Sequence, residues 1–227
     1  MTLPAIENKL EKSRIYNAVL LSVIWLVISW VAFLLDNYLG FTLNKYGLEP
    51  RELGGLIGII TMPFLHSNWE HLIQNSLAIL VLNTMLFYFY RPLSFQVFFQ
   101  AFFITPILLW IVCRNGNHIG ASAILYFEFG FMVLSGIIRK NPILMRAALV
   151  VILYYGSLVW YVFPIDKNVS WEGHACGLIV GIALSLINKN RGPQRKIFQY
   201  ETEPELPDDE NAYWKVPELK DDEKGAS

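Results

Sequence analysis

Residues 120–138 read GASAILYFEFGFMVLSGII, a turn of small residues that leads into an almost wholly apolar run. Gly120 can adopt backbone angles that are closed to larger residues, and the alanines on either side of Ser122 leave that serine room to project from the start of a helix. The first amides of a helix have no intrahelical partner and can face a developing negative charge. Taken alone, the stretch predicts a serine that caps a helix, because Gly-x-Ser is a short and common pattern.

The composition around this stretch is that of a membrane protein. Of the 227 residues, 54% are hydrophobic and only 16% are charged, whereas average soluble domains carry about 25% charged residues. Most of the charge lies in residues 1–14 and 189–227, so long charge-free runs remain between them. A spanning helix needs about 20 apolar residues. We therefore predict an all-α, polytopic membrane protein. A net charge of −1 gives no basic surface for nucleic acid, and no cofactor is predicted.

Six apolar segments are expected to span the membrane. They lie at about residues 15–35, 69–89, 93–113, 122–138, 142–163 and 171–187. The long connection at 36–68 mixes turn residues with short apolar pieces, which is typical of segments that lie in the membrane interface. The chain is thus divided into an N-terminal segment 1–14, a membrane domain 15–188 and an acidic, proline-containing tail 189–227 that we expect to be disordered.

Basic residues predict the orientation of the six spans, which place both termini on one side. Four basic residues fall on the opposite side (Lys45, Arg51, Arg114, Lys167). Eleven fall on the side of the termini (Lys9, Lys12, Arg14, Arg91, Arg139, Lys140, Arg146, Lys189, Arg191, Arg195, Lys196). The positive-inside rule then predicts cytoplasmic termini, in a bacterial inner membrane. The starts of the second, fourth and sixth spans face outward.

Polar side chains gather at those three starts, although such groups are rare in membrane spans and usually mark function. The second span carries His71 and Asn75 on one helix face, because they are four residues apart. The fourth opens with Ser122 and the sixth with Gly173-His174. Since all three spans begin on the same side, these groups are expected at similar depth.

These groups suit acyl-transfer chemistry. Ser122 needs a base to act as a nucleophile, and a neutral His174 in apolar surroundings can accept its proton. His71 and Asn75 can donate hydrogen bonds to a tetrahedral oxyanion, with the Ser122 amide as a third donor. Tyr126, one turn after the serine, can pack its ring on His174 and replace the carboxylate of a catalytic triad.

Structural interpretations of the same residues remain open. His174 is also compatible with simple packing, and His71 with Asn75 could bond across helices and hold the bundle together. A zinc site is a further alternative because four histidines are expected near the outer face (His66, His71, His118, His174). They lack a clustered carboxylate or Cys ligand, so no metal is predicted.

Two features of the fourth and sixth spans bear on how they pack. Gly173, Gly177 and Gly181 recur every four residues, which favours close approach of a neighbouring helix. If that neighbour is the fourth span, Ser122 and the sixth-span histidine can meet. Glu128 lies about 240° around the helix from Ser122, so we expect an interhelical contact there rather than a third catalytic residue.

Taken together, the motifs resemble the rhomboid family of intramembrane serine proteases. The resemblance covers about residues 36–187 and is carried by three elements: His66-(x4)-His71-(x3)-Asn75, Gly120-Ala121-Ser122 and Gly173-His174-(x2)-Gly177-(x3)-Gly181. It implies a six-helix rhomboid fold with a membrane-embedded first loop, and a short fourth helix that lifts the serine into a water-filled cavity. It also implies a Ser122–His174 dyad, an oxyanion site from His71 and Asn75, and supporting roles for Tyr126, His66 and Gly120.

The activity implied is that of a serine endopeptidase that cleaves single-pass membrane proteins within the bilayer, with the fifth span as a lateral gate. The sequence departs from the family at Ala123, where glycine usually follows the nucleophile. The alternative is a non-catalytic rhomboid-like protein that binds membrane clients, but such relatives typically lack the serine or the histidine. A transporter would need polar groups along a whole pathway, whereas here they stop at one depth. The oligomeric state is left open.

Overall fold

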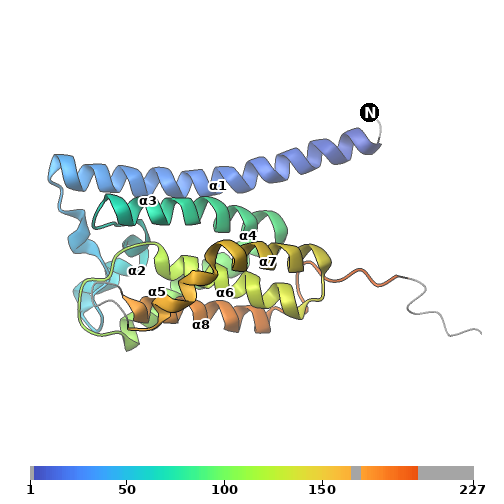
Figure 1. Cartoon of the computed structure of the whole chain (residues 1–227). Helices are drawn as coiled ribbons and strands as arrows, with labels where there is room; N and C mark the ends of the chain where they lie inside the picture. The colour runs from blue at the N-terminus through green and yellow to red at the C-terminus, as the bar shows by residue number, and fades with distance from the viewer. Residues whose placement is uncertain (1–2, 165–169, 199–227) are drawn as a thin grey trace, which may run out of the picture. The chain divides into compact units, whose positions relative to one another are not determined.

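The computed structural model describes residues 3–164 and 170–198. It consists mainly of helices, which lie at the apolar runs of the sequence (Figure 1). One unit extends from Met1 to Arg195. Within the described ranges no β-strand occurs, and Leu48 and His118 form an isolated β-bridge. The disordered tail expected from residue 189 lies outside the described residues from 199 onward.

The long helices coincide with the predicted spans. Their bounds are α1 (Leu3–Leu39), α3 (Trp69–Ala78), α4 (Thr84–Phe89), α5 (Ser94–Val112), α6 (Ser122–Ile138), α7 (Pro142–Tyr155) and α8 (Trp171–Ile187). A π-helical turn, η4 (Ile79–Asn83), joins α3 to α4, and a 3-10 helix, η5 (Gly156–Val162), continues α7. The first helix starts before the expected span, because residues 3–14 are rich in Leu, Glu and Lys, which favour helix.

The two helices that begin with the candidate catalytic residues are the short ones. Segments 6–39, 69–89, 94–112 and 142–162 are long and apolar enough to cross a membrane. In contrast, α6 and α8 have 17 residues each, or about 25 Å, which is less than a hydrocarbon core of about 30 Å. Most side chains of α6 are buried on every side, as expected for a central helix.

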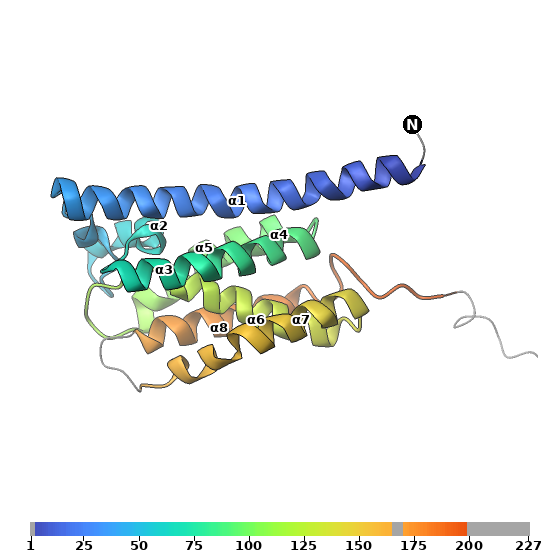
Figure 2. The same cartoon turned by 45° about the horizontal axis from the view of Figure 1, so that its top comes forward.

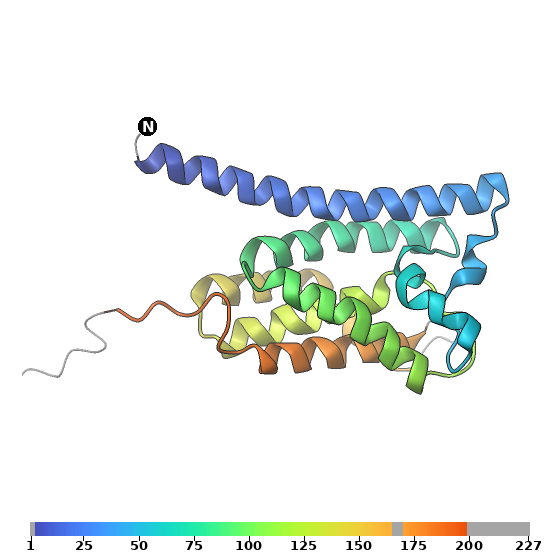
Figure 3. The same cartoon turned by 180° about the vertical axis from the view of Figure 1, so that it is seen from behind.

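Around α6 the other helices form the core. It packs most extensively on α8 and also contacts α5, α7 and η4 (Figure 2). α1 lies alongside η4 and α4 (Figure 3). The α6–α8 contact is close because it is made at glycines: a Cβ on Gly177 would lie 1.9 Å from the carbonyl oxygen of Ala123, and one on Gly181 would lie 2.4 Å from that of Phe127. The glycine stripe therefore faces the helix of Ser122. The spacing predicted a close neighbour, and the structure identifies it as α6.

The connection before α3 folds into short helical turns and binds the segment that precedes Ser122. These turns are η1 (Leu43–Tyr46), η2 (Leu53–Ile57), α2 (Gly58–Thr61) and η3 (Met62–Phe64). The amides of Leu48 and His118 donate to each other's carbonyl oxygens at 2.9 Å, and the amide of Gly120 donates to the carbonyl of Met62 at 2.9 Å. The first connection thereby fixes the turn from which Ser122 starts.

Candidate active site

Ser122 is the first residue of α6 and does not cap it. The N-cap position belongs to Ala121, and no side chain caps the helix there. Gly120 has a φ of +113°, in the range that favours glycine, so the chain can turn sharply just before the serine. The interpretation of Ser122 as a helix cap is therefore wrong. Ser122 is half-buried at the start of the helix, and its hydroxyl does not cap the helix amides.

Two hydrogen-bond donors converge beside this turn. A Cβ on Gly120 would lie 2.6 Å from Nε2 of His71 and 3.5 Å from Nδ2 of Asn75. Asn75 is only 6% exposed, and its Nδ2 has no hydrogen-bond partner in the described part of the chain. A buried donor without a partner is costly, so this one is available to an anion that enters the site. Asn68 fixes the start of α3 by accepting from the His71 amide at 2.9 Å.

Gly120→Ala tests this arrangement. Its methyl group would overlap the imidazole of His71 and would be strained at positive φ, so we expect a loss of stability of about 2 kcal/mol. Displacement of His71 is expected to lower the reactivity of Ser122 by about 10²-fold. Thermal unfolding and the rate at which a serine-reactive fluorophosphonate labels Ser122 measure the two effects. Gly54→Ala is the control because a Cβ there meets no atom within 4 Å, and equal losses in both variants would refute the arrangement.

His174 is held in a defined tautomer. Its ring is 7% exposed, and Nδ1 lies 3.0 Å from the carbonyl oxygen of Tyr161. A carbonyl can only accept, so Nδ1 carries the hydrogen and donates it. The other nitrogen, Nε2, then has a free lone pair and can accept a proton from a nearby hydroxyl.

Tyr126 covers the face of that imidazole. The two rings stack with centroids 4.1 Å apart and planes inclined by 7°. The Tyr126 hydroxyl donates to the carbonyl oxygen of Leu158 at 2.7 Å. Both Leu158 and Tyr161 belong to η5, so one 3-10 helix orients both rings through its backbone. These two carbonyls were missed from the sequence, because a backbone group leaves no signal in residue types.

Ser122 and His174 each lie within about one turn of the closest approach between α6 and α8. Gly177, one turn after His174, touches the carbonyl of Ala123, the residue after the serine. The Ala123 methyl group lies in a small apolar cluster with Leu48, Met62, Leu109, Cys113 and Cys176. The departure from glycine at position 123 is therefore accommodated by packing.

His66 lies next to the oxyanion candidates. Its ring is 1% exposed and packs edge to face on His71, with centroids 5.0 Å apart. Nδ1 donates to the carbonyl of Phe64 at 3.2 Å. Burial, and to a lesser extent the neighbouring His71, lowers the pKa of His66 to about 4. The neutral imidazole of His66 therefore packs on the ring of His71 and helps to hold it in place.

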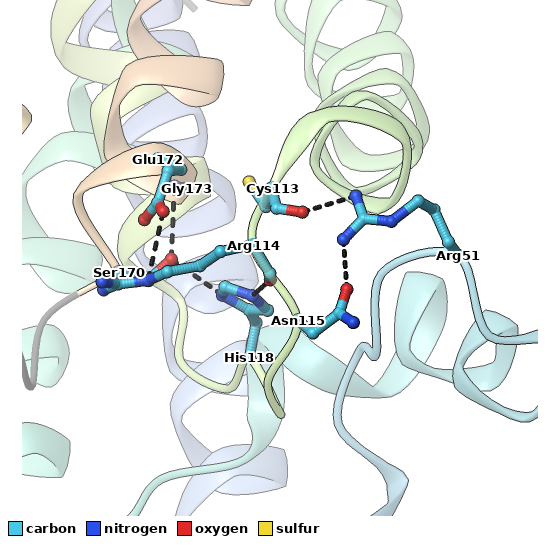
Figure 4. A network of polar contacts seen from close by, with 8 residues as sticks. All are labelled: Arg51, Cys113, Arg114, Asn115, His118, Ser170, Glu172 and Gly173. Atoms are coloured by element: carbon cyan, nitrogen blue, oxygen red, sulfur yellow. Dashed lines mark hydrogen bonds and ion pairs between the residues drawn. The ribbon is translucent and has the colours of Figure 1, made fainter.

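His118 lies apart from the candidate catalytic residues and joins two segments of the fold (Figure 4). Its Nε2 donates to the carbonyl of Arg114 at 3.1 Å, so its Nδ1 accepts from the hydroxyl of Ser170 at 2.8 Å. Ser170 in turn caps α8 by accepting from the amide of Gly173 at 3.3 Å. The segment before Ser122 is thereby tied to the start of the helix that carries His174.

Charged groups reinforce the same junction (Figure 4). Arg114 pairs with Glu172 at 3.1 Å, and Arg51 of the first connection donates to the carbonyl of Cys113 at 2.6 Å and to Asn115. Among the described residues, no group of three His, Cys, Asp or Glu side chains is placed to hold a metal ion. Of the four histidines considered for zinc, His66 packs on His71, whereas His118 and His174 each bond other groups.

The candidate site lies within the part of the chain that a protein-family model matches. A model of the Rhomboid domain matches residues 53–191. An uncharacterized protein of Mycobacterium tuberculosis is 29% identical over 176 residues, which cover 72% of this chain and 71% of the relative. An uncharacterized protein of Mycobacterium leprae is 25% identical over 182 residues, covering 76% and 71% respectively.

Proposed function

The chain belongs to the rhomboid family, and we propose that it is an intramembrane serine endopeptidase with a Ser122–His174 dyad. Family membership and the apolar helices make it an integral membrane protein. The observation that carries the proposal is the imidazole of His174, which is stacked on Tyr126 and bonded through Nδ1 to a carbonyl. That arrangement supports a neutral base with a free Nε2, on a ring that stacks on the residue one turn after Ser122.

In the first half of the proposed reaction, Oγ of Ser122 attacks the carbonyl carbon of a peptide bond while Nε2 of His174 takes the hydroxyl proton. The developing oxyanion accepts hydrogen bonds from His71, from Asn75 and from the Ser122 amide. Each such donor contributes about 10²–10³ in rate. The imidazolium then gives its proton to the leaving amine, and the peptide C–N bond breaks to leave an acyl-enzyme.

In the second half, water attacks the acyl carbonyl and His174 takes one of its protons. The imidazolium returns that proton to Oγ of Ser122, which restores the enzyme and releases the carboxylate product. The Tyr161 carbonyl can accept from Nδ1 throughout, so it stabilises the imidazolium and takes over part of the role of a triad carboxylate.

The substrates we propose are single-pass membrane proteins. A helical backbone shields its carbonyls, so the cleaved segment has to unwind locally before Ser122 can reach it. The orientation proposed from the basic residues puts both termini in the cytoplasm of a bacterial cell and the start of α6 toward the outer side of the inner membrane. Residues 142–162, which form α7 and η5, would then admit the substrate from the lipid.

Substitutions of Tyr126 test whether the orientation of the His174 ring affects the proposed catalysis. Tyr126→Phe keeps the stack and loses only the bond to Leu158, so we expect at most about a 10-fold fall in kcat. Tyr126→Leu removes the stack and is expected to lower kcat by about 10²-fold, with KM little changed. Cleavage kinetics of a reporter transmembrane substrate measure both. A fall confined to KM would contradict the positioning role.

The proposal is tested by labelling with a serine-reactive fluorophosphonate in detergent. Wild type and Ser185→Ala are expected to be labelled, whereas Ser122→Ala and His174→Ala are not. Ser185 is a matched control because it is a buried serine of α8 that bonds only its own helix. The alternative function, client binding without catalysis, predicts no labelling of any variant together with retained capture of membrane proteins.

A further inference from the structure

A small cavity lies beside α6 and is lined by residues of α1, η4, α5 and α6. It has about 10 Å³ of space for the centre of a water-sized sphere. Trp25 of α1, Asn83 of η4 and Glu128 of α6 are among the residues that line it, together with apolar neighbours such as Phe98 and Ala121. A cavity of about 10–15 Å³ by this measure is large enough for one water molecule.

Three polar atoms of the lining residues are buried and unpaired. Trp25, Asn83 and Glu128 are 7%, 3% and 1% exposed. The Trp25 Nε1, the Asn83 Oδ1 and the Glu128 Oε2 each lack a hydrogen-bond partner among the residues that the structure describes. One such atom costs about 1–3 kcal/mol, so three of them on residues that line one cavity point to an occupant of that cavity.

The chemistry of the three atoms matches water. The indole N–H can only donate and the amide oxygen can only accept. A water molecule accepts from Trp25 and donates to Asn83, and its remaining hydrogen or lone pair serves the carboxyl oxygen of Glu128, whichever of the two carries the proton. Buried waters make about three hydrogen bonds, as this one would.

A cation fits the same atoms poorly. The Trp25 N–H is a donor and cannot ligate a cation, and the unpaired acceptors among the three atoms are one amide oxygen and one carboxyl oxygen. The lining residues include no Lys or Arg, so an ionised Glu128 would have no compensating charge there. A carboxyl group without such compensation is favoured as the neutral acid in apolar surroundings.

We propose that Trp25, Asn83 and Glu128 bind one ordered water molecule, which joins the helix of Ser122 to α1 and to the π-helical turn. The π turn contributes to the site, because both of its ends, Ile79 and Asn83, line the cavity. Ala121, the N-cap of α6, borders the same cavity. The water would therefore support the start of α6 next to Ala121. Glu128 is in this sense a positioning residue for Ser122.

Infrared spectroscopy of the full chain in detergent tests the proposal. At neutral pH we expect a carbonyl stretch from a protonated carboxylic acid that is lost in Glu128→Gln. Trp25→Phe and Asn83→Leu each remove one partner of the water, so each is expected to shift this band to higher frequency. Trp30→Phe is the matched control and should leave the band in place, because Trp30 of the same helix bonds Ser76 instead.

The outcomes are decisive. Absence of the acid band would mean an ionised Glu128, as a bound cation requires, and would overturn the proposal. A carbonyl stretch whose frequency is unchanged in both Trp25→Phe and Asn83→Leu would mean that no shared water exists. If one of these variants does not fold, the other gives the same readout. An experimental structure that shows ordered water should place one peak within hydrogen-bonding distance of all three atoms, and a dry cavity would overturn the proposal.

Discussion

Ser122→Ala is expected to lower cleavage of a reporter transmembrane substrate by about 10⁴-fold or more, because the remaining donors cannot replace the attacking oxygen. The fold should be retained, since the Ser122 side chain does not cap α6. His174→Ala is expected to be as severe. The double variant should be no worse than either single variant, because nucleophile and base act as one unit.

The measurement is single-turnover cleavage in detergent micelles or vesicles, with thermal unfolding of each variant as the check on folding. Ser185→Ala serves as the matched control and should cleave at the wild-type rate. Persistent cleavage by Ser122→Ala would remove the proposed mechanism. Additive losses in the double variant would show that the two residues act separately.

Gly177→Ala is expected to be among the most disruptive glycine substitutions in the described part of the chain. Its Cβ would lie 1.9 Å from the carbonyl oxygen of Ala123 and 3.1 Å from Cβ of Tyr126, so α8 and α6 would have to separate. The obstacle is backbone, which cannot rotate away as a flexible side chain can. We expect a loss of about 3 kcal/mol or more in unfolding free energy. Activity should also be lost, since His174 would move away from the start of α6.

Reversible unfolding in mixed micelles, followed by circular dichroism, measures that loss. Gly54→Ala is the control and is expected to stay within about 0.5 kcal/mol of wild type, because a Cβ there meets no atom within 4 Å. Similar stabilities of the two variants would show that the α6–α8 contact is looser than the glycine positions imply.

Sequence patterns determined the helices because hydrophobic runs are local. The helices α6 and α8 start and end at the predicted residues, since a polar or small residue stands at each boundary. The four-residue glycine spacing also predicted which face of α8 admits a neighbour, because that periodicity is a property of the helix itself. The predicted convergence of Ser122, His174, His71 and Asn75 rested on their common depth, on the glycine stripe and on the family resemblance.

Tertiary structure decided what surrounds those residues. The carbonyls of Leu158 and Tyr161 orient Tyr126 and His174 from a 3-10 helix, and a backbone carbonyl is the same in every residue type. Trp25 and Asn83 line one cavity with Glu128 only because residues of α1, η4 and α6 come together there, and nothing in a one-dimensional pattern relates residues so far apart in the chain. The candidate catalytic residues were therefore readable from the sequence, whereas the groups that hold them in place follow from packing between distant segments.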